Sequence, residues 1–414
     1  MSQWKEYRVK DVAKRIGSGA TPNSGNEKYY DKGIFHWINT GDFNNSDIYS
    51  GKQMITERAL NEVSALRFYP VDTVLVAMYG ASIGKIGLLK VKATVNQACC
   101  AIVLNRRLCL SRYLFYVLMN NKDSFLQKSF GGTQPNISQT VVSNLILYIP
   151  SLSMQQRIVD YLDDKLAKID GRIKVLEKQQ NVYARLKKSV IHQAVIRGLN
   201  PNVSLKDSGI EWIGMIPEHW EVKRIKELCS FVSRGSTPDY VDESDFAVMN
   251  QAVFSSGCIN HEVVRYSSYM KPESKIEKGD LLIASTGGGI LGKLFFFNDE
   301  NEKFYADTHV TIVRSSKKSF YVKFLYYLFS IGYDMINSCM AKGSTNQTEL
   351  QKDKLIAYEI AIPSIEEQPK IIEYLDGKCA KIDSAIENIG KQIDASKRLK
   401  RALINEVITG QRAI

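Results

Sequence analysis

The sequence contains two copies of one plan, and this internal duplication constrains the fold more than any other feature. The stretch IPSLSMQQRIVDYLDDKLAKID begins at Ile149, and a close copy, IPSIEEQPKIIEYLDGKCAKID, begins at Ile362. Other segments recur in the same order: WKEYRVKDV matches WEVKRIKEL, GSGATP matches SRGSTP, and RLKKSVIHQAVIRG matches RLKRALINEVITG. Because self-similarity at a nearly fixed offset marks a repeated structural unit, we expect two domains with the same fold.

Each copy begins with a stretch of mixed character, at residues 1–150 and 217–362. Apolar runs such as DTVLVAM, QACCAIVL, DLLIAS and HVTIVR are typical of strands, and turns rich in Gly, Asn, Asp and Ser separate them. The aromatic run RYLFYVLMNN has the periodicity of a helix. We therefore expect a mixed α/β (α+β) domain in each copy, with matching Gly-rich hairpins at GASIGK and GGGILGK.

Each copy ends in a long stretch with almost no Pro or Gly, at residues 151–198 and 363–412. Apolar side chains recur there at steps of three and four residues, which predicts a helix with one narrow apolar seam. The seam residues are Leu162, Leu166, Ile169, Ile173 and Leu176 in the first copy, and Leu375, Ile382, Ile386, Ile389 and Ile393 in the second.

Such a seam is unfavourable in water, so we expect the two helices to pack on each other as an antiparallel coiled coil. Each helix would be roughly 65 Å long at about 1.5 Å per residue. Pro150 and Pro363 suit the helix starts, while Gly198 and Gly410 suit the ends. Residues 199–216, rich in Pro, Asn and Ser at their start, form the linker between the copies.

The charge balance points to a polyanionic partner. The net charge is +11, with an isoelectric point near 9.1, and a basic protein of this kind suits nucleic acid. The excess is uneven, because residues 1–150 carry 18 Lys and Arg against 10 Asp and Glu, whereas residues 207–362 carry 17 against 21. Any DNA-binding face in the second domain must therefore be a local patch.

Neither a membrane segment nor a metal site is indicated. No apolar run approaches the roughly 20 residues that a membrane-spanning helix needs, and the first residues lack the pattern of a signal peptide, so we expect a cytoplasmic protein. The seven cysteines and five histidines are scattered without the short spacing of a zinc site. We expect reduced, buried thiols and no bound metal.

The sequence resembles a known family, the specificity (S, HsdS) subunits of type I restriction-modification systems. The resemblance is carried by the lead-in SGIEWIGMIPEHWEVKRI from Ser208, the two IPS...Q openings with their YLD...KID continuations, the paired Gly-rich hairpins, GGTQPNIS from Gly131, and the matching helix ends. It covers nearly the whole chain, and the order and duplication of these motifs are more specific than any single one.

The resemblance implies a non-catalytic subunit with two target-recognition domains separated by conserved spacer helices, each domain reading one half of a bipartite target in double-stranded DNA. Two modification subunits, which methylate adenine with S-adenosylmethionine, would dock on it. Restriction subunits would complete the nuclease. The chain would then have no cofactor of its own.

Polar and basic side chains on the loops of each domain are the candidates for DNA contact, because amide, hydroxyl and guanidinium groups read base edges while Lys and Arg bind phosphates. In the first domain they are Ser18, Thr21, Asn39, Thr40, Asp42, Tyr79, Ser82, Lys85, Gln134, Asn136 and Ser138. In the second they are Arg234, Ser236, Thr237, Asn250, Gln251, Ser285, Thr286, Lys293, Thr345, Asn346 and Gln347.

Basic residues on the outer helix faces are further candidates for phosphates or a partner subunit, although a solvated helix end explains them equally well. They are Arg185, Lys187, Lys188, Arg398, Lys400 and Arg401.

Two other functions remain as alternatives. GGGILGK, from Gly287 to Lys293, fits part of a phosphate-binding loop and would suit a nucleotide-binding enzyme. Against it, Leu294 stands where Ser or Thr would hold magnesium, and Tyr79 replaces the first Gly in the other copy. A structural coiled-coil tether would explain the helices but not two divergent, loop-rich domains.

Overall fold

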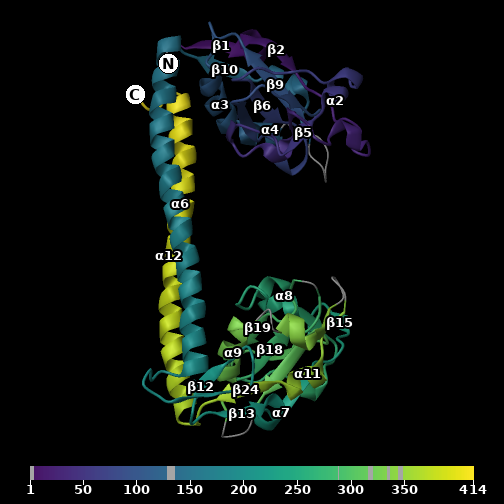
Figure 1. Cartoon of the computed structure of the whole chain (residues 1–414), viewed down its shortest axis with the longest axis vertical. Coiled ribbons are helices and arrows are strands. Elements are labelled where there is room, and N and C mark those ends of the chain that lie inside the picture. Colours follow the sequence, from purple (N-terminus) through teal and green to yellow (C-terminus); the bar gives the residue numbers. More distant parts are fainter. Residues whose placement is uncertain (1–3, 128–135, 288, 316–319, 333–335, 344–347) are drawn as a thin grey trace. The chain divides into compact units, whose positions relative to one another are not determined.

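The computed structural model describes residues 4–127, 136–287, 289–315, 320–332, 336–343 and 348–414. The chain forms two compact units, one of residues 1–177 and 391–414 and the other of residues 178–390. Two long helices, α6 (Leu152–Arg197) and α12 (Glu367–Ile408), contribute one part to each unit. Each unit therefore contains one α/β domain together with the helix segments that pack on it (Figure 1).

The first α/β domain is built from short strands and helices. They are β1 (Lys5–Arg8), α1 (Val9–Val12), β2 (Ala13–Gly17), η1 (Glu27–Tyr29), β3 (Phe35–Ile38), η2 (Thr40–Asp42), β4 (Ser46–Ile48), β5 (Gln53–Ile55), α2 (Glu57–Glu62), β6 (Val74–Ala77), η3 (Gly80–Ser82), β7 (Ile86–Leu89), β8 (Thr94–Val95), β9 (Cys99–Leu104), α3 (Ser111–Asn120), α4 (Lys122–Gln127), α5 (Gln139–Ser143) and β10 (Ile146–Ile149).

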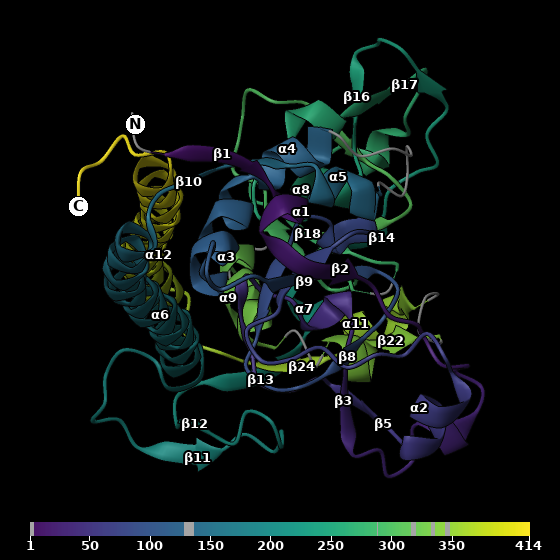
Figure 2. The same cartoon turned by 90° about the horizontal axis from the view of Figure 1, so that it is seen from above.

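Its larger sheet has the strand order β2-β9-β6-β7-β4, antiparallel except for the parallel pair β4·β7. A smaller sheet, β5-β3-β8, packs against it through a cluster that contains Ile38, Leu75 and Val95, and Figure 2 shows β3 and β5 next to α2. The predicted run DTVLVAM contains β6, which is buried along its length and forms a hairpin with β7. The strands β1 and β10 pair as a separate antiparallel ribbon that leads into α6.

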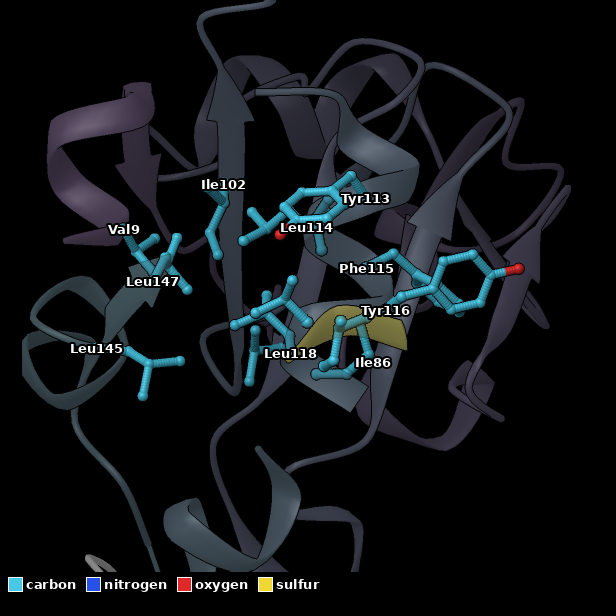
Figure 3. Packing of buried hydrophobic residues seen from close by; sticks show 14 of the residues in the cluster. Val9, Ile86, Ile102, Tyr113, Leu114, Phe115, Tyr116, Leu118, Leu145 and Leu147 are labelled. Carbon is cyan, nitrogen blue, oxygen red and sulfur yellow. The ribbon is translucent and has the colours of Figure 1, made fainter. Parts of the chain in front are cut away.

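The main core of this unit lies between the larger sheet, α3 and the two long helices. Figure 3 shows side chains of α3, Leu114 and Leu118 among them, converging near Ile86 of β7. Leu162 of α6 and Ile404 of α12 belong to the same cluster. Because burying one such side chain stabilises a fold by about 1.5–3 kcal/mol, this cluster fixes the domain on its helices.

The second α/β domain repeats the plan in the other unit. Its elements, with the linker hairpin, are β11 (Leu205–Asp207), β12 (Met215–Pro217), β13 (Glu221–Arg224), α7 (Ile225–Leu228), β14 (Phe231–Arg234), β15 (Tyr240–Val241), β16 (Phe246–Met249), α8 (Gln251–Phe254), η4 (His261–Val263), β17 (Arg265–Ser267), η5 (Pro272–Ser274), β18 (Leu281–Ala284), β19 (Leu294–Phe296), β20 (Phe304–Ala306), β21 (Val310–Arg314), α9 (Val322–Ile331), η6 (Ile336–Met340), β22 (Ala341–Lys342), β23 (Glu349–Leu350), α11 (Lys352–Ala357) and β24 (Glu359–Ile362).

The sheets of the second domain match those of the first. The order β14-β21-β18-β19 corresponds to β2-β9-β6-β7, and β15-β17-β16-β20 contains a parallel pair, β16·β20, in the place of β3·β8. The ribbon β13·β24 leads into α12 as β1·β10 leads into α6. The two-domain α/β architecture with long helices that the repeat predicted is thus confirmed.

The linker between the copies contains a hairpin that the sequence did not predict. Strands β11 and β12 pair as an antiparallel hairpin within residues 199–217. Trp212, between these strands, stacks on Tyr358 with ring centroids 6.2 Å apart. Buried Ile213 and Ile216 join the core of the second unit. The linker therefore packs on its domain, because it carries apolar residues that need cover.

The two long helices pair antiparallel within each unit. In one unit Lys400 Nζ lies 2.7 Å from the carboxylate of Asp170, and in the other Lys187 Nζ lies 2.6 Å from that of Asp383. Asp383 and Lys400 follow Asp170 and Lys187 by the same 213 residues, so the two ion pairs are equivalent by the internal repeat. Lys187 and Lys400, placed on the outer faces by the sequence analysis, instead link the two helices.

The seam residues lie on the packed faces of the helices. Leu162, Leu166, Leu176, Leu375, Ile382, Ile389 and Ile393 are buried. Ile169, Ile173 and Ile386 are half-buried.

A buried glutamine near the start of each long helix holds the adjacent domain. Gln155 Oε1 accepts a hydrogen bond from Leu110 N at 2.8 Å, while its Nε2 donates to Leu108 O and Pro150 O at 3.0 Å. Gln368 repeats this, accepting from Tyr321 N at 2.9 Å and donating to Pro363 O at 3.1 Å. Leu110 and Tyr321 precede the first turns of α3 and α9, so each glutamine fixes that helix.

A helix carboxylate makes a second contact of this kind. Asp163 accepts from Arg112 Nε at 2.9 Å and from the hydroxyl of Tyr116. In the other unit, Asp376 binds Lys323 Nζ at 2.7 Å and the hydroxyl of Tyr327. Burial, reinforced by the bond to Asp163, raises the pKa of Tyr116, so this hydroxyl stays protonated and donates throughout the neutral range.

Candidate nucleic-acid interface

In the first domain, the segment Asn96–Ala98 before β9 brings three of the predicted loops together. Asn96 N donates to Ile38 O at 2.9 Å, next to the loop of Asn39. Met78 N donates to Ala98 O at 2.8 Å, next to Tyr79, and Gly19 N donates to Asn96 O at 3.3 Å. These backbone bonds gather loops that are far apart in sequence at one edge of the sheets.

The fourth predicted loop of this domain joins the same group. Tyr79 forms an isolated β-bridge with Asn136, and Ile137 N donates to Met78 O at 2.9 Å. Asn136 and Ser138 are exposed, and the hydroxyl of Ser138 caps α5 by accepting from Val141 N. Gln134 lies outside the described residues.

The second domain has the same arrangement around Asp307–His309. Asp307 N donates to Met249 O at 3.3 Å, beside Asn250, and Ser285 N donates to His309 O at 2.8 Å. Ser236 N donates to Ala306 O at 3.1 Å, which brings in the loop of Arg234 and Thr237. Thr345, Asn346 and Gln347 lie outside the described residues.

A glycine is required where the first loop crosses the central segment. A Cβ on Gly19 would lie 1.7 Å from Val95 O, and one on Gly235 would lie 1.8 Å from Ala306 O. Both distances are far below van der Waals contact, so any other residue would push the loop away. This explains why GSGATP and SRGSTP share that glycine in otherwise different sequences.

Several predicted residues have structural partners in the first domain. Asn39 Oδ1 accepts from Gly41 N at 2.8 Å, and Asp42 Oδ2 accepts from Asn39 N at 3.0 Å, which together cap η2. Thr21 Oγ1 donates to Gln97 Oε1 at 2.5 Å. Of the remaining predicted residues, Tyr79 is exposed, whereas Ser18, Thr40, Ser82 and Lys85 are half-buried.

The second domain also assigns structural partners to several predicted residues. Asn250 Oδ1 accepts from Ala252 N at 2.9 Å and caps α8, as Asn39 caps η2. Arg234 pairs with Glu349 and donates to Leu350 O at 2.8 Å. Ser236 Oγ donates to Ser274 Oγ at 3.1 Å. Thr237 is exposed, and its hydroxyl makes no hydrogen bond among the described residues.

The prediction for one residue, Ser285, is wrong. Ser285 is 0% exposed, and its hydroxyl bonds to Thr311 Oγ1 at 2.6 Å and Ile283 O at 2.9 Å. A side chain enclosed in this way cannot reach a base edge, so Ser285 leaves the set of candidates. The error arose because its position after a strand, next to Gly-rich residues, suggested an exposed turn.

The sequence analysis missed the central segments themselves and Glu349. Asn96 Oδ1 accepts from Ala98 N at 3.1 Å and Asp307 Oδ1 accepts from His309 N at 2.9 Å, so the two turns are alike. Burial raises the pKa of Asp307, while the bond from His309 N acts in the opposite direction. The aligned pair VNQA and ADTH, each just before a buried strand, was the available signal.

The hairpin at GGGILGK does not have the geometry of a phosphate-binding loop. It joins β18 to the antiparallel strand β19, whereas a phosphate-binding loop leads into a helix. Lys293 Nζ, the residue that would bind phosphate, donates to Ser255 O at 3.0 Å. The hairpin predicted from both copies is therefore confirmed, and the nucleotide-binding alternative is not favoured.

Thiols and acidic groups give no sign of a metal centre. Among the described residues, no three His, Cys, Asp or Glu side chains gather as they would around a metal ion. All seven cysteines are free, and five are buried, but Cys258 and Cys339 are exposed, which corrects the expectation that every thiol is enclosed. Of the helices in the described ranges, none is long and apolar enough to cross a membrane.

Comparison with known proteins identifies the family. The sequence pattern described as the type I restriction modification DNA specificity domain matches residues 1–178 and again residues 217–394. The chain belongs to this family. Its two matched regions each contain one α/β domain and the beginning of the long helix that follows it, so the chain is a specificity subunit with two specificity domains.

Relatives along the whole length support the assignment. The type I restriction enzyme MjaVIII specificity subunit of Methanocaldococcus jannaschii is 27% identical over 351 residues, covering 82% of this chain and 79% of that protein. The MjaIX specificity subunit of the same organism is 25% identical over 421 residues, covering 99% and 93%.

Solved structures share the fold of this specificity subunit. A chain from a study of complex assembly and conformational transition in the type I restriction-modification system matches with a TM-score of 0.76 at 17% identity, covering 99% of this chain and 98% of that one. The HsdS subunit from Thermoanaerobacter tengcongensis matches with a TM-score of 0.52 at 17% identity, covering 100% and 98%.

Proposed function

We propose that this specificity subunit recognises an asymmetric, bipartite DNA target, with each α/β domain reading one half. The observation that carries the proposal is the equivalence of the two loop groups. Both domains gather corresponding loops around a central segment through the same backbone bonds, as Met78 N to Ala98 O and Ser285 N to His309 O illustrate. The side chains on these loops differ, which supports two different half-sites.

The division of labour within each loop group follows from side-chain chemistry. Hydroxyl and amide groups at the loop ends, such as those of Thr21, Asn136 and Thr237, can read donors and acceptors on base edges. Basic residues such as Lys85 suit phosphates, which fix the register of a protein on the duplex without reading sequence. The basic excess of the first domain suits a broad phosphate contact.

The long helices would act as the spacer that fixes the separation of the half-sites. The equivalent ion pairs Asp170–Lys400 and Lys187–Asp383 support a single pairing register, which a spacer of constant length requires. The internal repeat gives the subunit two like surfaces, which suits the docking of two modification subunits. Restriction subunits would join them, as the resemblance implies.

In this proposal the chain carries out no catalysis. S-adenosylmethionine would be bound by the modification subunits, whose chemistry is methyl transfer to adenine, and the chain would hold no cofactor. The complex would act in the cytoplasm, where the host DNA lies.

The test is to sequence methylated bases in host DNA. Cells that carry this chain with its modification subunits should show methylated adenine in one bipartite motif with a fixed gap, and cells without the chain should not. The absence of any such motif, although the complex assembles, would contradict the proposal.

A domain exchange tests the modular part separately. Replacing residues 1–150 by the corresponding domain of a related subunit should change one half-site and leave the other half-site and the gap unchanged. A change in both half-sites would rule out independent reading by the two domains.

A further inference from the structure

Two loop positions in one domain match two in the other by their backbone hydrogen bonds, but the side chains at these positions differ. Met78 N donates to Ala98 O at 2.8 Å, and Ser285 N donates to His309 O at 2.8 Å. The next residues, Tyr79 and Thr286, form isolated β-bridges with Asn136 and Glu349. Tyr79 and Ala98 in the first domain therefore occupy the positions of Thr286 and His309 in the second. The structural counterpart of Tyr79 is thus Thr286, which corrects the sequence alignment of Tyr79 with Gly287.

The larger side chain stands at the first of these positions in one domain and at the second in the other. In the first domain an aromatic residue, Tyr79, is 42% exposed and its counterpart is the small Ala98. In the second, the short Thr286 is matched with the imidazole of His309, and Oγ1 lies 2.7 Å from Nδ1. We call Tyr79–Ala98 and Thr286–His309 the variable pairs. Each pair presents one extended polar or aromatic group on an otherwise equivalent framework.

His309 makes one hydrogen bond through its backbone and one through its ring. Its backbone N donates to Asp307 Oδ1 at 2.9 Å, and its Nδ1 is engaged by Thr286. The residue is nevertheless exposed, and Nε2 has no hydrogen-bond partner within the described part of the chain. Because the residue is exposed and its Nδ1 is engaged, the ring is already ordered for a contact through Nε2, so binding loses little side-chain entropy.

A second observation on the same hairpin points to a ligand. Gln251 Oε1 is buried and has no hydrogen-bond partner among the described residues, and buried polar atoms are normally satisfied. Gln251 Nε2 lies 3.7 Å from the position that a Cβ on Gly287 would occupy. The oriented imidazole of His309 thus lies beside Thr286, and the amide of Gln251, with its unsatisfied acceptor, lies near Gly287.

We propose that the variable pairs select the base at one position of each half-site, and that His309 makes this contact in the second domain through Nε2. This inference rests on the proposed function, because it assumes that each domain reads its own half-site. The imidazole nitrogen can donate to or accept from a base edge in the major groove, as purine N7 and O6 or an exocyclic amine requires. In the first domain the exposed Tyr79 takes this place.

The test measures discrimination by the complete complex of the chain with its modification subunits. Duplexes that carry each single base substitution in either half-site are methylated in parallel, and the ratio of rates to that of the correct duplex is determined. His309→Ala should reduce discrimination on the order of tenfold at one position of the second half-site. Discrimination in the first half-site should stay unchanged.

Two further variants separate base contact from a structural role. Thr286→Val keeps the imidazole but removes its hydroxyl partner, so it should weaken discrimination at the same position by less than His309→Ala does. His261→Ala removes another exposed histidine of the same domain, which faces Glu302 at 3.5 Å, and should leave every position unchanged.

The outcomes are distinct from those of the wider proposal. If the wild-type complex methylates a bipartite motif but His309→Ala retains wild-type discrimination at every position, the inference is wrong. The same holds if His309→Ala slows methylation of all duplexes equally. If the wild-type complex shows no bipartite motif, the proposed function fails instead.

Discussion

Polar residues that both copies retain often serve the fold, while those that differ lie on loop ends. Asn39 and Asn250 both cap a short helix, and Gln155 and Gln368 both fasten a domain to its helix. Residue type alone did not separate these roles, since Asn and Ser cap helices and also read bases. The partners that decide between them are distant in sequence and become visible only in the structure.

Gln155→Ala should loosen the first domain on its helix. The substitution leaves Leu110 N and two carbonyl oxygens without their partner in a buried site, which we expect to cost about 2–4 kcal/mol. Peptide-resolved hydrogen exchange on the full chain should show faster exchange in α3, and no change in α9.

Gln156→Ala is the matched control, because Gln156 is exposed and, among the described residues, its side chain bonds only to Asp160, on its own helix, at 2.7 Å. Equal exchange in the two variants would show that Gln155 does not hold α3.

Buried thiols make the stability of the first domain sensitive to alkaline pH. Burial raises the pKa of Cys100 to about 12, whereas a thiol in an unfolded chain has a pKa near 8.5. The folded state therefore keeps a proton that the unfolded chain releases. Stability from this group is fully present below about pH 8.5 and falls as the pH rises toward 12, by up to about 1.4 kcal/mol per pH unit.

Cys100→Ala should make the free energy of unfolding fall less steeply with pH, because one buried thiol no longer contributes. Urea unfolding under reducing conditions at pH 7.5, 8.5 and 9.5 measures this slope. Cys258→Ala, which removes an exposed thiol, should leave the slope of the free energy of unfolding unchanged. A wild-type slope in Cys100→Ala would refute the assignment.

At the scale of elements, the helix pair combines an apolar seam with ion pairs in one register. Asp170–Lys400 and Lys187–Asp383 are both partly exposed, so each contributes modestly to stability. The two ion pairs mainly fix the register, because an antiparallel pairing shifted by a few residues would separate both of them at once.

Asp170→Lys should lower the melting temperature by placing two cations side by side, and the double variant Asp170→Lys with Lys400→Asp should restore it. The coupling energy in this double-mutant cycle should be about 0.5–1 kcal/mol. Asp164 serves as control, because its partner Lys168 lies on the same helix at 2.8 Å. Asp164→Lys should show no coupling to Lys400→Asp, and equal coupling in both cycles would contradict a specific pair.

Much of this architecture was predictable from periodicity. Regular spacing of apolar residues gave the long helices, and the Gly-rich runs between apolar runs gave the β6·β7 and β18·β19 hairpins. The linker hairpin β11·β12 was not predicted, since its strands are short and its stability comes from contacts such as Trp212 on Tyr358. The structure brings loops with predicted DNA-binding residues together, and their contact with DNA stays a prediction. The central segments were not predicted, because backbone bonds between distant loops define them.

At the scale of the whole molecule, the repeat gives the two domains equivalent contacts with their long helices. Asp163 and Asp376 accept from equivalent pairs, Arg112 with Tyr116 and Lys323 with Tyr327. The ribbon ahead of each long helix and the glutamine just inside it are likewise equivalent. A second-domain sequence placed in the first position would therefore find the partners that it needs.

Replacing residues 4–150 by residues 220–363 should thus give a folded subunit with two copies of the second domain. Because each domain is attached by equivalent contacts to its own helix, and the two helices pair antiparallel, we expect the two half-sites to become the same sequence in inverted orientation, as in the sites of symmetric dimers. Sequencing of methylated DNA should show a palindromic motif with the original gap. His309→Ala in both copies should then relax both halves, whereas an asymmetric motif from the duplicated chain would show that half-site choice does not reside in the domains alone.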